Sequence, residues 1–407
     1  MSMRIVIVKH LMLLTTLFAV ACKNKRGAEK ENGANHQENV FKASTQGRLA
    51  GSASFYKRLE GTVGGKQVVV HFSRFKDFFL ANYYYKEHGR PIQLYFRPDA
   101  VLEGDSIELI EYEPTRKYEY EDEREIKWHF TFTETGARGK WISRDGNTTH
   151  EIALKESYPG GSYIFNAIGF EDSVLIPFRK DTLTARSKEM MLEPADASLA
   201  APWFKNALLA AIWGDSSQAS SLTLTQLLEK NTKDFLKDFK EDVDTLLANF
   251  EPGDSSMYRV LHYDNLMNAN LMYNDNNFIV MDVGVYTYTG GAHGLQGSSI
   301  ICYDVNKKNE MNLQDILKID SATLQPIVEK NFRIQNKMRP NARLDQILFE
   351  NKLPANNNFY FTHKGIGFVY QPYEAAAYVY GILNVFVPFT DLKPYINPAF
   401  AQRMNIE

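Results

Sequence analysis

His293 lies in the setting of this sequence that most suggests chemistry. It belongs to "YTYTGGAHGLQG", a stretch from Tyr286 to Gly297 that contains four glycines. A glycine-rich turn exposes backbone N–H groups and lets the chain approach a ligand closely. Imidazole is a common base and metal ligand at neutral pH. The stretch therefore indicates a catalytic, ligand-binding or purely structural loop. The candidate ligand-binding residues are Gly290, Gly291, His293, Gly294 and, further along the chain, Tyr373.

Glu374 is the candidate partner of His293 in a catalytic pair. It lies in "QPYEAAAYVYG" and could face His293 in space as a base or metal ligand. The histidines are isolated, at positions 10, 36, 71, 88, 129, 150, 262, 293 and 363. A zinc site built from His262, His293 and His363 stays open, but their spacing gives no reason to assume it. We predict no metal site and no cofactor, and favour a binding or turn-stabilising His293 over a catalytic one.

Other chemical motifs are weak in this sequence. It has no G-x-S-x-G elbow, no P-loop and no dinucleotide-binding fingerprint. Asp282, in "VMDVGV", is a charge within an apolar strand pattern, and alternation predicts that it faces solvent. Cys302, in "SSIICYDV", is expected to be a buried and inert thiol. The runs "NYYYK" and "QLYFRP" could stack on sugar rings with their outward half, while the other half faces the core.

The N-terminus predicts export and a lipid anchor. Residues 1–22 combine Arg4 and Lys9 with a short apolar run that ends in "FAVAC", the layout of a secretory signal. This ending resembles a lipobox, so Cys22 is the expected lipidation site, palmitate being an expected acyl group. An ordinary signal peptide cut after "AVA" is the alternative. Residues 23–48 are polar and predict a flexible tether. Lys23 after the cysteine favours the outer membrane.

Composition narrows the class of protein. The net charge is -3 over 407 residues, so a nucleic-acid partner is not expected, since such binders carry a basic footprint. Aromatic residues make up 13% of the chain, with 26 Phe and 22 Tyr, which favours a large β-rich core or an aromatic binding surface.

Periodicity predicts two domains of the α+β class. Residues 49–180 contain short strand patterns separated by Gly-containing turns, typical of an antiparallel β-meander, closed or curled. Residues 181–407 mix helices with strands. A helix is predicted to begin at Pro202 and end before Gly214, and a longer amphipathic one runs from Thr223 to Asn249. The strand patterns that follow favour an antiparallel sheet with flanking helices.

The C-terminal half resembles a known family. The motifs are "YTGGAHG" at 288–294, "MNLQDIL" at 311–317 and the segment around "QPYEAAAYVYG". Over roughly residues 185–400 they are similar to a domain-of-unknown-function family. That family occurs in the accessory region of PdaC-type peptidoglycan deacetylases and in the outer domain of the RsiV-type anti-sigma regulator, which binds lysozyme. The resemblance implies an α+β module at the cell envelope. It implies no enzyme, because deacetylation belongs to a separate domain whose metal-ligand motifs are missing here.

We therefore expect an exported, lipid-anchored envelope protein that is more a binder than an enzyme. The expected partners are the membrane through Cys22, and a wall glycan or an envelope or lysozyme-like protein. The alternative is a peptidoglycan-directed hydrolase or deacetylase that uses His293 and Glu374. A third possibility is a scaffold lipoprotein without a small ligand. A carboxylate about 3 Å from His293 would favour the enzyme, and an exposed aromatic patch beside the loop would favour the binder.

Overall fold

The computed structural model describes most of the chain downstream of the predicted tether. The described residues are 54–96, 106–112, 125–178, 181–195, 199, 202–213, 221–248 and 262–406. The predicted signal peptide, the tether and Cys22 lie outside them. No helix among the described residues is long and apolar enough to span a membrane.

The N-terminal part forms a closed barrel of eight antiparallel strands, each paired with the next and β1 paired with β8. The strands are β1 (Phe55–Val63), β2 (Lys66–Phe75), β3 (Phe78–Tyr85), β4 (Ile92–Phe96), β5 (Ser106–Glu111), β6 (Lys127–Thr133), β7 (Gly136–Ile142) and β8 (Thr149–Glu156). Alternate residues such as Val68, Val70 and Phe72 fill the interior, as the pleat of a strand requires. The predicted β-meander is confirmed, in its closed form.

A six-stranded sheet with the order β14-β13-β12-β11-β10-β9 follows the barrel. Its strands are β9 (Phe165–Phe178), β10 (Asp181–Pro194), β11 (His262–Asp275), β12 (Phe278–Thr289), β13 (Leu295–Asp304) and β14 (Asn309–Glu310). Because β9 pairs with β10 along its whole length, residues 165–178 belong with this sheet, although the sequence suggested a boundary at residue 180. Among the described strands, one pair departs from the expected antiparallel pairing: β10 and β11 are parallel, because helices carry the chain back between them.

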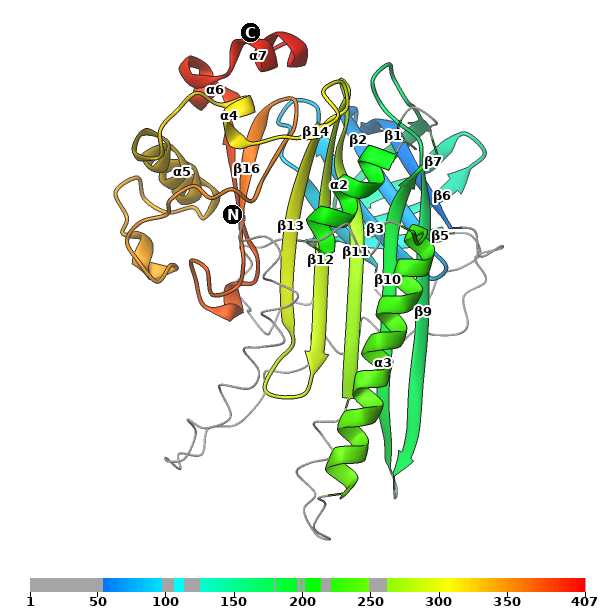
Figure 1. Cartoon of the computed structure of the whole chain (residues 1–407). Helices are drawn as coiled ribbons and strands as arrows, with labels where there is room; N and C mark the ends of the chain where they lie inside the picture. Colours follow the sequence, from blue (N-terminus) through cyan, green and yellow to red (C-terminus); the bar gives the residue numbers. More distant parts are fainter. Residues whose placement is uncertain are drawn as a thin grey trace.

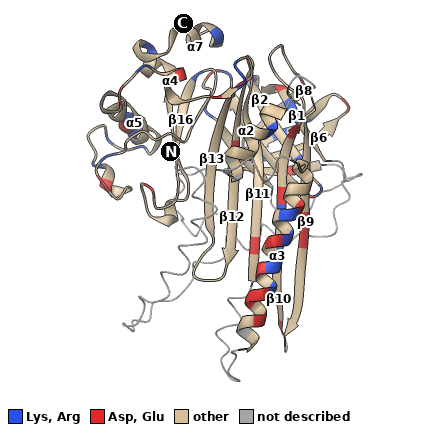
Figure 2. Ribbon diagram, viewed as in Figure 1, with Lys and Arg blue, Asp and Glu red and all other residues tan. Residues whose placement is uncertain are grey.

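Helices α2 (Pro202–Trp213) and α3 (Leu224–Ala248) begin and end close to the predicted positions. They lie across one face of the six-stranded sheet (Figure 1). One side of α3 is apolar and buried, with Leu228, Phe239 and Val243 fully covered. Its other side carries lysines and acids (Figure 2), which form ion pairs at i,i+4 spacing such as Lys237–Glu241. This amphipathic pattern explains why α3 needs the sheet in order to be stable.

A three-stranded sheet lies beside the long strands in Figure 1. It consists of β15 (Phe359–Phe361), β16 (Gly365–Tyr370) and β17 (Leu383–Pro388), in that order. The helical segments around it are α4 (Leu313–Ile316), α5 (Ser321–Gln335), η3 (Leu344–Gln346), η4 (Tyr378–Tyr380), α6 (Phe389–Leu392), η5 (Lys393–Tyr395) and α7 (Pro398–Met404). Their apolar side chains form one core with β12 and β13. The C-terminal half is thus α+β, as predicted.

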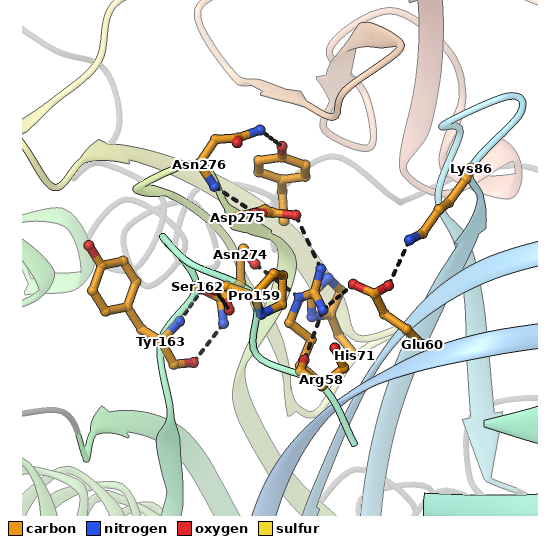
Figure 3. A network of polar contacts seen from close by, with 12 residues as sticks. Arg58, Glu60, His71, Lys86, Pro159, Ser162, Tyr163, Asn274, Asp275 and Asn276 are labelled. Atoms are coloured by element: carbon orange, nitrogen blue, oxygen red, sulfur yellow. Dashed lines mark hydrogen bonds and ion pairs between the residues drawn. The ribbon is translucent and has the colours of Figure 1, made fainter. Parts of the chain in front are cut away.

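Arg58 of β1 joins the barrel to the six-stranded sheet (Figure 3). Only 1% of this arginine is exposed. Its guanidinium donates to the Asn274 carbonyl at 3.1 Å, to Glu60 at 2.6 Å and to Asp275 at 3.2 Å. The side chain of Asn274 in turn holds the backbone N–H and carbonyl of Tyr163, at 2.9 and 2.7 Å. A buried charge is tolerated only with such complete pairing.

We predict that Arg58→Met lowers the free energy of unfolding by about 3–5 kcal/mol, because it leaves buried acceptors without a donor. The neighbouring Lys57 bonds Glu156 at a half-exposed position, so Lys57→Met should cost at most about 1 kcal/mol. Urea unfolding of the two variants measures the difference. Equal costs would contradict the role assigned to Arg58.

Three polar residues, Glu189, Asn231 and Asn265, separate two apolar clusters between α3 and the sheet, and we call them the polar belt. Glu189 of β10 is fully buried and accepts hydrogen bonds from Asn231 and Asn265. Burial raises the pKa of its carboxyl to about 8. On one side of the belt, the first turns of α3 pack with α2 in one apolar cluster. On the other, Phe235, Phe239 and Val243 form a separate cluster with β10 and β11.

The free energy of unfolding should therefore fall as the pH rises from 4.5 to about 8. The ordinary pKa of a glutamate is 4.5, so the folded chain holds a proton that the unfolded chain releases above that pH. The contribution of neutral Glu189 is complete below pH 4.5 and is lost as the pH approaches about 8. Glu189→Gln keeps the neutral shape without the titration.

We expect Glu189→Gln to melt at a higher temperature than the wild type at pH 8 and at a similar one at pH 4.5. Melting curves of both proteins across this range test the prediction. Parallel pH profiles for the two proteins would show that Glu189 does not titrate in the fold.

Candidate functional site

The glycine-rich loop connects β12 to β13, as the sequence predicts. Gly290 and Gly291 have φ angles of 91° and 98°, a region that residues with a Cβ rarely adopt. Gly294 is required for another reason: a Cβ there would lie 2.4 Å from the ring of Tyr286. The loop is therefore shaped by close backbone approaches at its start and at its end.

His293 is exposed at the tip of this loop, and tyrosines hold it. Its Nδ1 lies 2.9 Å from the Gly294 carbonyl, and its Nε2 lies 3.2 Å from the Tyr373 hydroxyl. Because a carbonyl only accepts, Nδ1 carries the hydrogen, and Nε2 of the neutral ring accepts from Tyr373. The imidazole also stacks on Tyr378, with 3.9 Å between ring centroids and 20° between planes. The Tyr378 hydroxyl donates to the Gly294 carbonyl at 2.6 Å.

We call His293, Tyr373 and Tyr378 the aromatic platform. The two tyrosine rings lie 5.7 Å apart at an angle of 34°. Tyr373 is 54% exposed and has a φ of 67°, a strained backbone for a bulky residue. Val379 and Tyr380, in η4 beside Tyr378, are also exposed. The platform thus presents aromatic faces to solvent, which a buried core cluster would not do.

Glu374 does not contact His293 through any hydrogen bond or ion pair in the described part of the chain. One of its oxygens accepts from Asn356 at 2.9 Å, and the other accepts from the Gln371 backbone at 2.7 Å. The carboxylate thereby closes the turn that presents Tyr373. The side chain that contacts His293 is therefore Tyr373. Glu374 stabilises the turn that carries Tyr373.

The other histidines considered for a zinc site have separate partners. His262 contacts Thr184 Oγ1 at 2.8 Å, and His363 contacts the Lys86 carbonyl at 2.7 Å. Burial lowers the pKa of His363. Among the described residues, no group of three His, Cys, Asp or Glu side chains could hold a metal ion.

Asp282 and Cys302 lie on the two strands that carry the loop. Asp282 is half-buried, contrary to the expectation that it faces solvent, because the three-stranded sheet and the barrel flank this side of β12. It accepts from Ser298 Oγ at 2.6 Å, and burial raises its pKa to about 6. Cys302 is 2% exposed and donates to the Phe359 carbonyl, so the predicted buried thiol is confirmed.

The sequence-based candidates did not include Tyr378 or Gln371. Gln371 anchors the turn to β13, because its amide bonds both the N–H and the carbonyl of Ser298, at 3.0 and 2.7 Å. Tyr378 reaches the loop from η4, a short 3-10 turn. Both residues belong to the "QPYEAAAYVYG" segment. Their partners are far away in the sequence, so no periodic pattern of residues pointed to these contacts.

Comparisons with known families match two successive segments of the chain. The family model "Deacetylase PdaC" matches residues 198–296, which run from α2 into β13. The model "Protein of unknown function (DUF3298)" matches residues 314–390, which run from α4 to α6. No protein among the curated sequences matches the chain. The aromatic platform takes His293 from the first segment, and Tyr373 and Tyr378 from the second.

Two solved structures are similar to this chain. A DUF3298 family member from Bacteroides fragilis NCTC 9343 is 17% identical with a TM-score of 0.53, covering 61% of this chain and 100% of its own. A DUF3298 family protein from Pseudomonas aeruginosa PAO1 is 18% identical with a TM-score of 0.40, covering 59% and 98%. Identities this low concern the fold alone, and we base the shared fold on the first structure. Within residues 198–390, this chain is thus similar first to the PdaC family model and then to the DUF3298 family model.

Proposed function

We propose that this chain is a non-catalytic binding module of the bacterial cell envelope, and that it binds a wall glycan through the aromatic platform. The observation that carries this proposal is the exposed stack of His293 on Tyr378 beside Tyr373. Flat apolar ring faces suit pyranose rings, and the hydroxyls at their edges suit sugar hydroxyls. The resemblance to PdaC-type accessory regions supports a location in the cell envelope.

The contacts of His293 support binding better than catalysis. A hydrolase or deacetylase that used His293 and Glu374 would need the carboxylate, or a shared metal, beside the imidazole. The imidazole instead accepts from a tyrosine hydroxyl and lies flat on a second tyrosine. One carboxylate oxygen of Glu374 accepts from Gln371 in its own turn, and the other accepts from Asn356. These interactions orient rings and leave no base directed at a reacting atom.

Export and lipid attachment at Cys22 complete the proposal. A lipid at Cys22 and the polar residues 23–48 would hold the folded part near the membrane while letting it reach the wall. With Cys22 lipidated, Cys302 would be the one remaining thiol of the two cysteines. It is 2% exposed, which fits a chain that needs no disulfide in an oxidising compartment.

We predict that Tyr373→Ala and Tyr378→Ala each weaken binding to purified peptidoglycan about tenfold, or about 1.4 kcal/mol, because each removes a ring from the platform. Leu175→Ala, which removes an exposed apolar side chain of β9, is the matched control and should bind as the wild type does. Co-sedimentation with peptidoglycan gives the affinities. Retention on immobilised lysozyme without retention on peptidoglycan would overturn the glycan proposal in favour of a protein partner.

The anchor is tested by metabolic labelling with radioactive palmitate in a bacterium that makes this chain. The wild type should take up label and partition into detergent, and Cys22→Ser should do neither, because acylation needs the Cys22 sulfur. Cys302→Ser should label normally. An unlabelled wild type would instead fit an ordinary signal peptide cut after Ala21.

A further inference from the structure

The side of the six-stranded sheet that faces the barrel carries a row of polar side chains. Antiparallel pairing places Asn268 opposite Gly284, Asn270 opposite Asp282 and Gln296 opposite Tyr286. Directly opposed residues share a face of a sheet, and so do residues two positions apart. We call Asn268, Asn270, Asp282 and Gln296 the amide face. It lies on β11, β12 and β13, next to the loop that carries His293.

Polar groups of the amide face lack partners in the described part of the chain. The side-chain amides of Asn268 and Gln296 make no hydrogen bond to another described residue, although both are half-buried. Asn270 is 5% exposed, and its Oδ1 has no hydrogen-bond partner. Gly284 leaves room for the amide of Asn268, because a Cβ there would lie 3.1 Å from Asn268 Oδ1. Unpaired buried amides are costly, so the amide face is suited to a polar ligand.

Two aromatic side chains connect the amide face to its surroundings. Tyr286 stands on the same side of β12, and its ring packs against Gly294 of the loop. The amide face is therefore continuous with the aromatic platform. Tyr112, which follows β5 of the barrel, borders it from the other module. Its hydroxyl and Gln296 Nε2 lie 3.6 and 3.7 Å from the place that a Cβ on Gly381 would take.

Arg90 supplies a positive charge where the barrel, the six-stranded sheet and the three-stranded sheet meet. It lies in the connection between β3 and β4, is half-buried, and makes no hydrogen bond or ion pair to a described residue. The adjacent Gly89 packs on the turn between β15 and β16, since a Cβ there would lie 2.5 Å from Lys364 and 2.7 Å from Thr362. Three residues after Arg90, the Gln93 carbonyl accepts from the Tyr112 backbone N–H at 2.9 Å. Because Tyr112 borders the amide face, the segment that carries Arg90 approaches the same corner from the barrel.

We propose that this junction binds a saccharide that bears a carboxylate, with the carboxylate on Arg90 and the sugar hydroxyls on Asn268 and Gln296. A guanidinium recognises a carboxylate with two parallel hydrogen bonds. Carboxamides both donate and accept, as alternating sugar hydroxyls require. Ligand sites favour the boundaries between modules. This inference rests on the proposed glycan binding, and it adds the ligand class and the part of the site that the barrel supplies.

Calorimetric titration of the purified chain with two disaccharides tests the inference. One is the wall disaccharide of N-acetylglucosamine and N-acetylmuramic acid, which carries a carboxylate. The other is chitobiose, which does not. We expect the wild type to bind the acidic disaccharide at least about tenfold more tightly, or about 1.4 kcal/mol. Arg90→Gln should abolish this preference and leave the affinity for chitobiose unchanged. Gln296→Ala should weaken both sugars equally.

Arg339→Gln is the charge-matched control, since Arg339 is exposed on a loop after α5 and should keep the full preference. A melting temperature equal to that of the wild type shows that each variant is folded. Equal binding of both sugars by the wild type, or a preference that survives Arg90→Gln, would overturn the inference while glycan binding itself stands. Binding of neither sugar by the wild type would overturn the proposed function as well.

Discussion

Burying the charge of Arg58 is the constraint that fixes the two halves of this molecule against each other. The guanidinium has lost water, so it must meet carbonyls and carboxylates from both halves at once. Glu60 comes from the barrel, while Asn274 and Asp275 come from the end of β11. Glu60 also pairs with Lys86 at 2.6 Å, in the connection that leads to Arg90. The barrel therefore cannot rotate on the sheet without exposing an unpaired charge.

This fixed position matters for the surface that we assign to ligand binding. The aromatic platform takes its residues from the segment similar to the PdaC model and from the segment similar to the DUF3298 model. The barrel adds Tyr112, which borders the amide face, and Arg90. A module of the second half alone would keep His293, Tyr373 and Tyr378. It would lack Arg90 and Tyr112. In the proposed site, the N-terminal barrel would therefore contribute to recognition as well as to stability.

Local patterns in the sequence predicted much of the fold. Alternation of apolar and polar residues identified the barrel strands. Helix α2 was identified by Pro202 at its start and Gly214 after its end, and α3 by its apolar stripe. The parallel pairing of β10 with β11 was missed, because pairing between strands far apart in sequence depends on the helices that connect them. Asp282 was placed in solvent for a related reason: alternation gives the face of a strand, but not what packs over that face.

The candidate site was predicted in part. The glycines around His293 identified the loop, and Tyr373 does contact the histidine. Tyr378 was missed because its contacts with the loop join segments far apart in the chain. Glu374 was a reasonable candidate by proximity in sequence to Tyr373. Hydrogen bonding within a turn determines where such a carboxylate points, and sequence alone does not show that turn.

The polar belt around Glu189 has a consequence for how the helical layer moves. Leu228 packs in the cluster that α3 shares with α2, and Phe239 packs in the smaller one beyond the belt. Since the two clusters do not share their apolar contacts, the distal half of α3 is held by the smaller one, together with the hydrogen bond from the Tyr263 hydroxyl to Asp242 at 2.7 Å. Local opening energies follow such packing units rather than whole helices. This packing predicts that the distal half of α3 opens as a cooperative unit of its own, while the strands that carry the loop stay packed under α2.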